Sequence, residues 1–251
     1  MNDESLYPLT TSTITVAIIL FLCILFFVLI IVRYHSRYVK LQKDRIFAEI
    51  TIQENERKRI ATDLHDSLGP LLSAVKLNIN SIEMQYPDDK EIIDKSGRYL
   101  DEIIGSMRQI SYNLLPNTLE RKGLAEAIKE FIGQINHKNN AVNIHFFVIK
   151  EFVVPKEKEI HVFRIIQEIV HNTIKHANAR SLQIGLTAED GNLLLLTKDD
   201  GKGFDINKEK LIKQGLGLKS LESRVEILNG ILSLESIPDQ GTNYFIKIPL
   251  S

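Results

Sequence analysis

The sequence predicts a multi-domain chain with three parts: a single transmembrane helix, an all-α hairpin and an α+β sandwich. Three observations carry this prediction. Residues 14–32 form an unbroken apolar run. Apolar residues then recur at alternating four- and three-residue steps as far as Leu114. Beyond Leu124 the period changes, and β-branched runs alternate with glycine-containing turns.

The apolar run from Ile14 to Val32 contains one hydroxyl residue, Thr15. At about 1.5 Å per residue, a helix of this length spans a hydrocarbon core of about 30 Å. Two alternatives are a buried core helix and a cleaved signal peptide. The preceding Asp3 and Glu4 do not suit a signal peptide, which begins with basic residues. We therefore expect a membrane anchor.

Basic residues follow the apolar run. They are Arg33, Arg37, Lys40, Lys43 and Arg45. The positive-inside rule then places residues 1–13 outside the cell and the rest of the chain in the cytoplasm, as a single-pass membrane protein. A segment as short as 1–13 does not hold a folded sensor domain, so the signal is expected to be read elsewhere.

Composition narrows the function classes. The chain has 251 residues and a formal net charge of -1, which gives no bulk attraction to nucleic acid, so no direct nucleic-acid binding is expected. Cys23 is the only cysteine and lies in the apolar run. This excludes a disulfide framework or a thiolate metal site within one chain and agrees with a cytoplasmic soluble part.

The stepped apolar pattern predicts two long helices. Residues 33–54 read as a coiled-coil linker, and residues 55–120 as a helical hairpin broken at Pro87-Asp88-Asp89. The second helix is expected to stop at Leu115-Pro116, because Pro116 disfavours helix in the residue before it. Such a hairpin cannot bury both apolar faces alone. A homodimer that forms a four-helix bundle is the expected solution.

Residues 121–251 are predicted to form the α+β sandwich, with helices on one face of a sheet. The turn at Asp190-Gly191 joins two of its strands. The expected helices are 124–134, 156–175 and 218–228, and the expected strands are 142–149, 182–187, 193–197, 231–237 and 243–248.

A histidine beside a carboxylate lies in the middle of the first long helix, at His65-Asp66. Leu64 falls on the apolar seam, so His65 and Asp66 are expected to point toward solvent. An imidazole on the outside of a rigid helix is able to act as a nucleophile or a proton carrier near neutral pH.

A polar row marks one helix of the sandwich. Glu168, Asn172 and His176 recur at i, i+4 and i+8, so they share one face. A carboxylate, an amide and an imidazole in that row suit a magnesium–triphosphate group, since Mg²⁺ prefers oxygen ligands. The alternative is an ordinary solvated helix face, and the row alone does not separate the two.

Glycine-containing segments follow in a fixed order. Asp199-Asp200-Gly201-Lys202-Gly203 comes directly after a strand, where glycines let the backbone approach a ligand and a carboxylate accepts from an exocyclic amine. Gly215-Leu216-Gly217-Leu218 opens a helix, where backbone N–H groups hold phosphate. Gly241-Thr242 begins the last strand. Each segment alone is also consistent with a surface turn.

Taken in order, these segments resemble the ATP-binding domain of the superfamily that includes histidine kinases, gyrase, chaperones and mismatch-repair ATPases. The His65 segment, with Arg57, Arg59-Ile60-Ala61 and Leu64 before it, resembles the phosphoacceptor box of two-component sensor histidine kinases. Within these it is similar to the group typified by nitrate and membrane-fluidity sensors, which pair with LuxR-type response regulators. The resemblance covers roughly residues 45 to 250.

The resemblance implies an ATP-dependent histidine protein kinase that passes its phosphoryl group to a response-regulator aspartate. His65 is then the phosphorylated residue. Asp66 accepts a hydrogen bond from one ring N–H and leaves the other nitrogen as nucleophile. Asn172 holds Mg²⁺ through ATP, with Glu168 nearby as a polarising carboxylate. The alternatives are a catalytically silent dimeric scaffold and a non-kinase ATPase of the same superfamily.

The resemblance also implies how ATP is held. Lys175 and His176 contact the phosphates, and Asp199 binds the adenine amine. The other nucleotide-binding residues it implies are Gly201, Gly203, Gly215, Gly217 and Thr242, with 204–214 as a short lid.

Two positions depart from the family pattern. In this group a Gln or His often lies four residues after the acceptor-adjacent Asp, where it is thought to place water for dephosphorylating the regulator. Here that position is Pro70, so little phosphatase activity is expected, together with a helix bend after His65. Lys198, just before Asp199, has no explanation from the pattern. Helical phase puts His171 away from the Glu168–Asn172 face, which favours a structural role.

Overall fold

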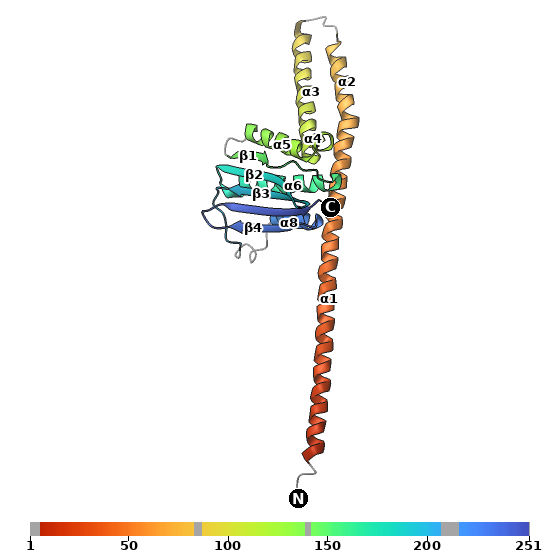
Figure 1. Cartoon of the computed structure of the whole chain (residues 1–251). Coiled ribbons are helices and arrows are strands. Elements are labelled where there is room, and N and C mark those ends of the chain that lie inside the picture. The colour runs from red at the N-terminus through yellow and green to blue at the C-terminus, as the bar shows by residue number, and fades with distance from the viewer. Residues whose placement is uncertain (1–5, 83–86, 139–141, 207–215, 251) are drawn as a thin grey trace. The chain divides into compact units, whose positions relative to one another are not determined.

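The computed structural model describes residues 6–82, 87–138, 142–206 and 216–250, and the chain divides into two compact units, residues 1–52 and 53–251. Helix α1 spans Leu6–Asp63 (Figure 1). Its residues 6–52 are the described part of the first unit, and its last residues, 53–63, belong to the second. Its large apolar side chains from Val16 to Val32 are exposed, and its most apolar window has a mean hydropathy of 3.2. By length and composition this helix is able to cross a membrane.

The second unit contains a helical hairpin and a mixed sheet with its covering helices. In chain order its elements are a π-helical turn (Leu64–Leu68), α2 (Gly69–Asn80), α3 (Pro87–Leu114), α4 (Asn117–Lys122), α5 (Leu124–Lys138), β1 (Asn143–Val148), α6 (Lys156–Asn172), a second π-helical turn (Thr173–Ala177), β2 (Ser181–Glu189), β3 (Asn192–Asp199), α8 (Leu216–Ile227), β4 (Ile231–Ser236) and β5 (Thr242–Pro249).

The predicted hairpin is confirmed. Helices α2 and α3 run side by side (Figure 1), and Lys76 Nζ lies 2.5 Å from Asp101 Oδ1 across them. The Ser111 hydroxyl donates to the carbonyl of Ala61 at 3.3 Å, which ties the end of α3 to α1. Helix α3 ends at Leu114, as the following proline predicts. Helix α4, between the hairpin and the sandwich, was not expected.

Apolar side chains remain uncovered along both hairpin helices. They are Leu68, Leu71, Val75, Leu77, Ile82, Ile92, Tyr99, Ile103 and Ile110. A soluble monomer rarely leaves such a continuous apolar stripe in water. This stripe is the kind of surface that the hairpin of a second copy would cover in the predicted four-helix bundle.

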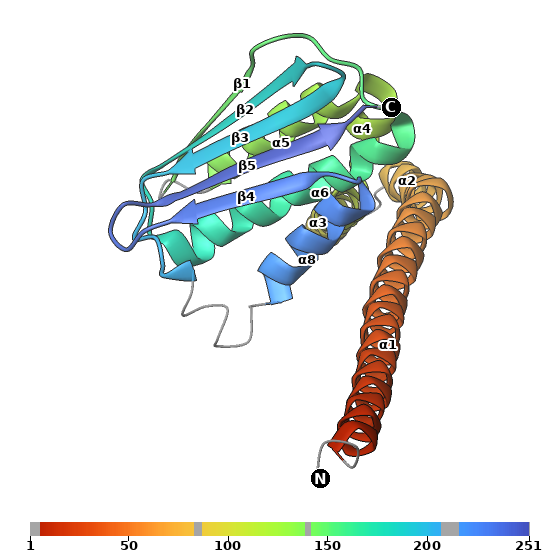
Figure 2. The same cartoon turned by 60° about the horizontal axis from the view of Figure 1, so that its bottom comes forward.

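The sandwich is built on a five-stranded sheet in the order β1-β2-β3-β5-β4. β1 and β2 are parallel, and the other neighbouring pairs are antiparallel. Figure 2 shows α5, α6 and α8 on one face of this sheet. Between the two layers lies a core that includes Phe163 of α6, Leu195 of β3 and Leu221 of α8, all fully buried. The α+β sandwich predicted from the period change is confirmed.

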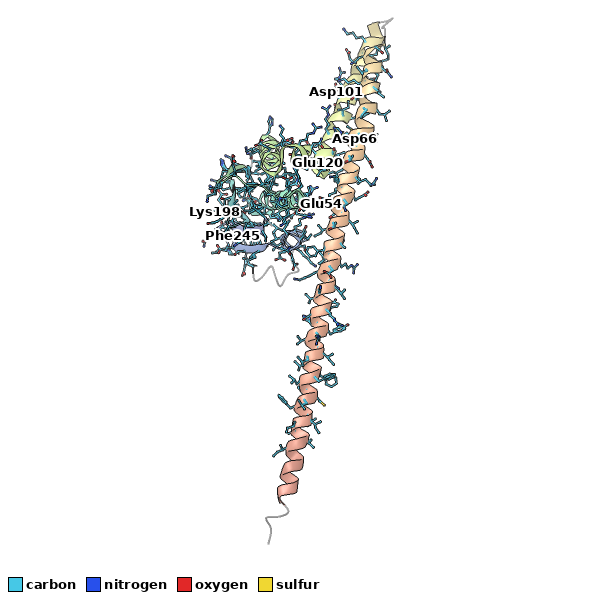
Figure 3. All side chains as sticks on the ribbon, turned by 45° about the vertical axis from the view of Figure 1, so that its right-hand side comes forward. Glu54, Asp66, Asp101, Glu120, Lys198 and Phe245 are labelled. Carbon is cyan, nitrogen blue, oxygen red and sulfur yellow. The ribbon has the colours of Figure 1, made fainter. Side chains whose placement is uncertain are left out.

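The other face of the sheet is open and explains Lys198. Along β3 the side chains alternate, so Thr197 and Asp199 face the helices and Lys198 faces solvent. In the register, Lys198 stands opposite Gln183 of β2 and Asn243 of β5, both of which are also exposed. Lys198 and Phe245 are labelled on this sheet in Figure 3. A basic residue before Asp199 is therefore an ordinary solvent-facing strand residue.

Candidate functional site

A cavity of about 520 Å³ opens where α6 ends and α8 begins, beside the ends of β3 and β5. It gathers eight residues that the sequence singled out: Glu168, Asn172, Lys175, His176, Asp199, Gly203, Gly217 and Thr242. These residues come from segments up to 74 positions apart, since Glu168 lies on α6 and Thr242 on β5. The described residues therefore bring most of the predicted nucleotide-binding set to one place.

The polar row lies on the wall that α6 supplies. Glu168 and Asn172 are in the α-helix, but Thr173–Ala177 form a π-helical turn that ends at Asn178 with a left-handed φ of 52°. The helix predicted through Lys175 continues to Ala177, but its last five residues have π-helical pitch. The wider turn still leaves Lys175 and His176 lining the cavity. His171, which lies in α6 before that turn, lines the cavity as well. The expectation that His171 faces away from the site is therefore corrected.

Gly217 at the start of α8 lies directly against this wall. A Cβ atom on Gly217 would be 2.1 Å from Glu168 Oε1 and 3.5 Å from Asn172 Oδ1. No side chain fits there while Glu168 keeps its position. Gly217 thus lets the backbone of α8 approach the Glu168 and Asn172 side chains. Gly215, also predicted for this site, lies outside the described residues.

Asp199 forms the opposite corner of the cavity. It is only 3% exposed, and its Oδ1 accepts hydrogen bonds from the N–H groups of Gly201 at 2.9 Å and Thr242 at 3.2 Å. Burial raises the pKa of this carboxyl, and the two backbone N–H groups partly oppose the rise. Both hydrogen bonds use Oδ1. Oδ2 is therefore available as an acceptor for a ligand.

The neighbouring Asp200 has a different task. Its Oδ1 accepts from the N–H groups of Arg180 at 2.8 Å and Ser181 at 2.9 Å, which fixes the loop before β2. These hydrogen bonds, the one from Ser181 first, lower the pKa of Asp200. Of the two adjacent aspartates, only Asp199 lines the cavity.

The two glycines after Asp199 are needed for close packing of the chain on itself. Gly203 lines the cavity with a φ of 54°, and a Cβ there would be 2.1 Å from the Ile237 carbonyl oxygen. Gly201, which was also predicted to lie beside the nucleotide, is not among the residues that line the cavity. A Cβ on Gly201 would instead be 2.4 Å from the Ala177 carbonyl oxygen. Its lack of a side chain lets the loop pack against the π-helical turn.

Several cavity residues were not predicted. They are Thr173, Ala177, Lys202, Leu218 and Tyr244, besides His171, whereas Phe204 is the first residue of the predicted lid. Tyr244 had a readable signal, because strand alternation puts it on the same face as Thr242. Lys202 and Phe204 are sequence neighbours of Gly203, but nothing in their spacing shows which way they point.

The donor set of the cavity fits Mg²⁺ bound together with phosphates. Glu168 and Asn172 offer a carboxylate and an amide oxygen, and Mg²⁺ usually takes one or two protein oxygens with the remainder from water and phosphate. Among the residues that the structure describes, no group of three His, Cys, Asp or Glu side chains forms a self-sufficient metal site. Lys175, His176 and Lys202 add basic groups at the same rim.

His65 and Asp66 lie outside the cavity, on the first π-helical turn. The His65 Nδ1 atom is 2.8 Å from Asp66 Oδ1, as expected, and the two side chains are 59% and 65% exposed. The turn has a local cause. Pro70 has no N–H to bond the Asp66 carbonyl, and the Gly69 N–H donates to the Leu64 carbonyl five residues back. His65 thus lies in a widened turn of the helix.

Comparison with known proteins agrees with this two-part site. A family model described as "Histidine kinase" matches residues 56–119, and one described as "Histidine kinase-, DNA gyrase B-, and HSP90-like ATPase" matches residues 157–251. The chain belongs to the histidine kinase family. The model that matches residues 56–119 is of the type typical of kinases that pair with LuxR-type regulators. The chain thus carries the two domains of a histidine protein kinase, a family whose members bind ATP, dimerise and pair with response regulators.

Curated relatives in this family include sensor proteins. Sensor protein VraS of Staphylococcus haemolyticus is 33% identical over 221 residues, which cover 87% of this chain and 60% of that protein. Sensor protein VraS of Staphylococcus aureus strain COL is 34% identical over 203 residues, which cover 80% of this chain and 57% of that protein. The chain therefore spans about 60% of the length of these relatives. A histidine kinase domain from Erythrobacter litoralis aligns with a TM-score of 0.47 at 19% identity, over 78% of this chain and 94% of that one.

Proposed function

We propose that this chain is a membrane-anchored sensor histidine kinase that phosphorylates His65 with ATP and transfers the phosphoryl group to an aspartate of a response regulator. The observation that carries the proposal is the contact between His65 Nδ1 and Asp66 Oδ1 on an exposed turn. With Nδ1–H donating to Asp66, the second ring nitrogen, Nε2, keeps its lone pair and faces solvent. That is the arrangement a nucleophilic imidazole needs.

In the proposed reaction, Nε2 of His65 attacks the γ-phosphorus of ATP. The bond between the γ-phosphorus and the β,γ-bridging oxygen breaks, and ADP leaves with that electron pair. Asp66 stabilises the positive charge that develops on the ring through its hydrogen bond to Nδ1–H. In the second step, a carboxylate oxygen of the regulator takes the phosphoryl group and His65 returns to its neutral state.

Different residues of the cavity would hold the base, the Mg²⁺ ion and the phosphates of ATP. Asp199 Oδ2 would accept from the adenine amine, with Thr242 and Gly203 beside the base. Asn172 and Glu168 would hold Mg²⁺, which supplies charge neutralisation at the phosphates when bound. Lys175 and His176 would contact the phosphates, and Gly217 would line their path. Because His65 does not line the cavity, transfer needs another conformation or a second copy that brings His65 to the nucleotide.

The remaining assignments follow from charge and exposure. The apolar stretch 14–32 with basic residues after it supports an anchor whose kinase part is cytoplasmic. The exposed apolar stripe of α2 and α3 supports a homodimer. The partner is proposed to be a LuxR-type response regulator, because the family model that matches residues 56–119 suggests that type.

Incubation of the full chain in detergent micelles with γ-labelled ATP and Mg²⁺ tests the proposal. We expect an acid-labile protein label that is absent in His65→Gln. His145→Gln is the matched control, since His145 is also exposed but lies on β1. It should label like the wild type. An unlabelled wild-type protein, or a label that survives His65→Gln, contradicts the proposal. Asp66→Asn should label more slowly, because the ring loses the carboxylate that fixes its tautomer.

A further inference from the structure

A second cavity, of about 410 Å³, has no part in the proposed reaction. Its lining is divided by element. Helix α5 supplies only apolar residues, Phe131 and Ile135, whereas α1 and α8 supply only polar ones. Helix α6 lies between α5 and α8 and contacts both (Figure 2). The lining residues of α1 and α8 are Gln53, Arg57, Ser220 and Arg224, and the remaining ones are Arg164, Gln167, Glu168, Val170, His171 and Ile174.

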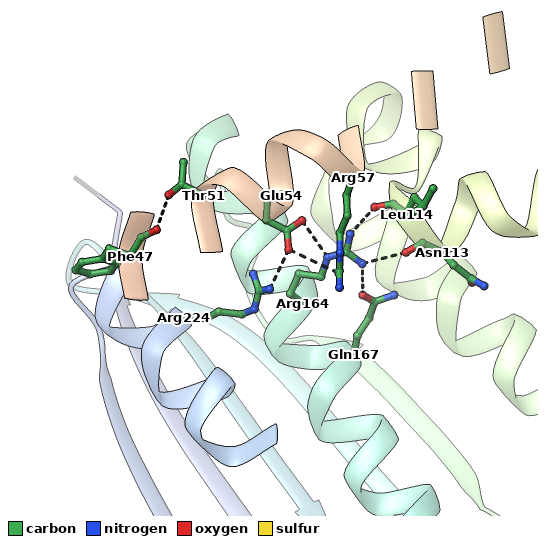
Figure 4. A network of polar contacts seen from close by, with 9 residues as sticks. All are labelled: Phe47, Thr51, Glu54, Arg57, Asn113, Leu114, Arg164, Gln167 and Arg224. Atoms are coloured by element: carbon green, nitrogen blue, oxygen red, sulfur yellow. Dashed lines mark hydrogen bonds and ion pairs between the residues drawn. The ribbon is translucent and has the colours of Figure 1, made fainter. Parts of the chain in front are cut away.

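The polar side of this cavity carries more positive charge than its carboxylates neutralise. Glu54 is the shared ion-pair partner of Arg57, Arg164 and Arg224 (Figure 4). Among the described residues that line the cavity, Glu168 is the only carboxylate. Three guanidinium groups and these two carboxylates leave one positive charge. Because a desolvated charge without a counter-charge costs free energy, the cavity is a place where one negative charge is stabilised.

Two of the three guanidinium groups have donors left for an anion. Arg224 is 6% exposed, and its Nη1 is buried without a hydrogen-bond partner in the described part of the chain. The Arg57 side chain is 34% exposed, and its Nη1 lies 3.8 Å from Glu54 Oε1, which is too far for a hydrogen bond. Arg164, by contrast, donates to Glu54, to Gln167 and to two backbone carbonyls. An anion is therefore expected to meet Arg57 and Arg224.

We propose that this cavity binds an organic monoanion, a carboxylate that carries an apolar body. Its carboxylate would accept hydrogen bonds from Arg57 and Arg224. Its apolar body would lie against Phe131 and Ile135, which are partly buried and pack on the core. A single negative charge matches the one positive charge in excess, and the apolar wall favours an organic anion over an inorganic one.

The place of the cavity gives such a ligand two neighbours. One is α1 at Gln53 and Arg57, where the helix leaves the predicted linker 33–54. The other is the nucleotide cavity, whose lining shares Glu168 and His171 with this one. A ligand here would therefore contact both the signalling helix and the wall of the ATP site, and would provide an input that residues 1–13 are too short to supply.

The test uses 3-phenylpropionate, in which two methylene groups join one carboxylate to a phenyl ring. Its dissociation constant for the full chain in detergent micelles is measured by calorimetry, with protein-free micelles as the blank. Two analogues separate the contributions: 3-phenylpropanamide lacks the charge, and acetate lacks the apolar body. Each should bind at least about tenfold more weakly, because a hydrogen bond to a charged group and burial of a phenyl ring each contribute a tenfold change or more.

Arg57→Gln should weaken the binding of 3-phenylpropionate by about tenfold. The variant should keep the wild-type urea midpoint, since it removes a partly exposed charge that is already in excess. Arg59→Gln is the matched control. It makes the same change two residues later, where Arg59 pairs with Glu56 at 2.6 Å and with Asp63 at 2.9 Å and does not line the cavity. It should bind the probe like the wild type.

Four results would overturn the inference. They are a wild-type protein that does not bind 3-phenylpropionate, equally tight binding of the amide or of acetate, wild-type affinity in Arg57→Gln, and an equal loss in Arg59→Gln. Equal binding of acetate would leave an adventitious anion site only. All four are read from binding without ATP, so they are distinct from a failure of His65 to become labelled, which concerns the proposed function.

Discussion

Glu54 Oε1 lies 2.9 Å from Arg224 Nη2, and its other oxygen lies 3.3 Å from Arg164 Nε (Figure 4). The three residues are 8%, 6% and 6% exposed and come from α1, α8 and α6. The Glu54–Arg224 contact is an ion pair that is not aligned as a hydrogen bond. One buried carboxylate thus serves two buried guanidinium groups from different helices of the ATPase domain.

Arg164 extends the network to the end of the hairpin. Its Nη1 donates to the Asn113 carbonyl at 3.1 Å and to Gln167 Oε1 at 2.7 Å, and its Nη2 donates to the Leu114 carbonyl. Burial lowers the pKa of both arginines, and the charge of Glu54 opposes that change. Glu54 is therefore the anion on which two desolvated cations depend.

We predict that Glu54→Gln destabilises residues 53–251 by about 3–5 kcal/mol, because it leaves two buried guanidinium groups without a counter-charge. Glu56→Gln is the control, since it removes the same charge two residues later, where Glu56 forms an exposed pair with Arg59 at 2.6 Å. Exposed pairs contribute little, so this variant should unfold like the wild type. The measurement is the urea midpoint of the full chain in micelles.

A second substitution checks the mechanism of that loss. Arg224→Met in the Glu54→Gln background removes one of the two uncompensated charges and should recover part of the lost stability. Equal midpoints for Glu54→Gln and Glu56→Gln, or a further drop in the double variant, would show that Glu54 is not the anion that holds this network.

Gly217 and Gly203 should respond differently to the same added methyl group. In Gly217→Ala the Cβ meets the flexible end of Glu168, so the protein should fold while the carboxylate is displaced. We expect autophosphorylation to fall at least about tenfold with an unchanged unfolding midpoint. In Gly203→Ala the Cβ meets the Ile237 backbone carbonyl at a positive φ, and strain of this kind is worth about 1–3 kcal/mol. The midpoint itself should fall.

Gly133→Ala provides the neutral reference for both variants. Gly133 lies in α5, and a Cβ there meets no atom within 4 Å. Alanine is the better helix former by about 0.5–1 kcal/mol, so this variant should be as stable as the wild type or more so. A Gly217→Ala protein with full autophosphorylation would mean that Glu168 does not need its observed position.

Pro70 leads to a prediction about the reverse reaction. Because proline offers no side-chain hydrogen bond, the wild-type kinase should not speed the loss of phosphate from the regulator it phosphorylates. Pro70→Gln places an amide one turn past His65-Asp66 and should increase the rate of that loss. Pro70→Ala is the matched control, since it restores the backbone N–H without adding an amide. The rate is followed as disappearance of label from the phosphorylated regulator. Rapid loss with the wild type would contradict the prediction.

Much of the fold and of the cavity follows from short-range pattern. Strand alternation and glycine turns locate the sheet, and the spacing of Glu168 and Asn172 gives one cavity wall. The same alternation explains Lys198 once the sheet is known to have an open face. These features are readable because each depends on neighbours within a few residues.

What could not be predicted depends on contacts between distant segments or on small changes of helical pitch. Arg164 and Glu54 are 110 residues apart, and nothing in either helix pattern pairs them. The π-helical turn at Thr173–Ala177 is such a change of pitch. Helical phase alone also misplaced His171, which lies in α6 before that turn and lines the cavity. Strand alternation puts Tyr244 on the same face as Thr242, but only the fold shows that this face lines the cavity.

His161 of α6 should make stability depend on pH near neutrality. Its Nδ1 is buried without a partner in the described part of the chain, and burial, followed by the charge of Arg224, lowers its pKa. Glu54 raises this pKa and Arg164 lowers it further, both as smaller influences. As pH falls below about 6.5, the unfolded chain takes up a proton at this residue while the folded protein does not. The unfolded state then binds more protons, so stability is lost on acidification.

Urea midpoints of the wild type and of His161→Gln between pH 7.5 and 5.5 test this. Every other titrating group is common to both proteins, so the difference between their slopes isolates His161. We expect the wild type to lose stability more steeply on acidification, and the two curves to run parallel above pH 7, where His161 is neutral in both states. Parallel curves over the whole range would show that His161 is protonated as readily in the folded protein as in the unfolded chain.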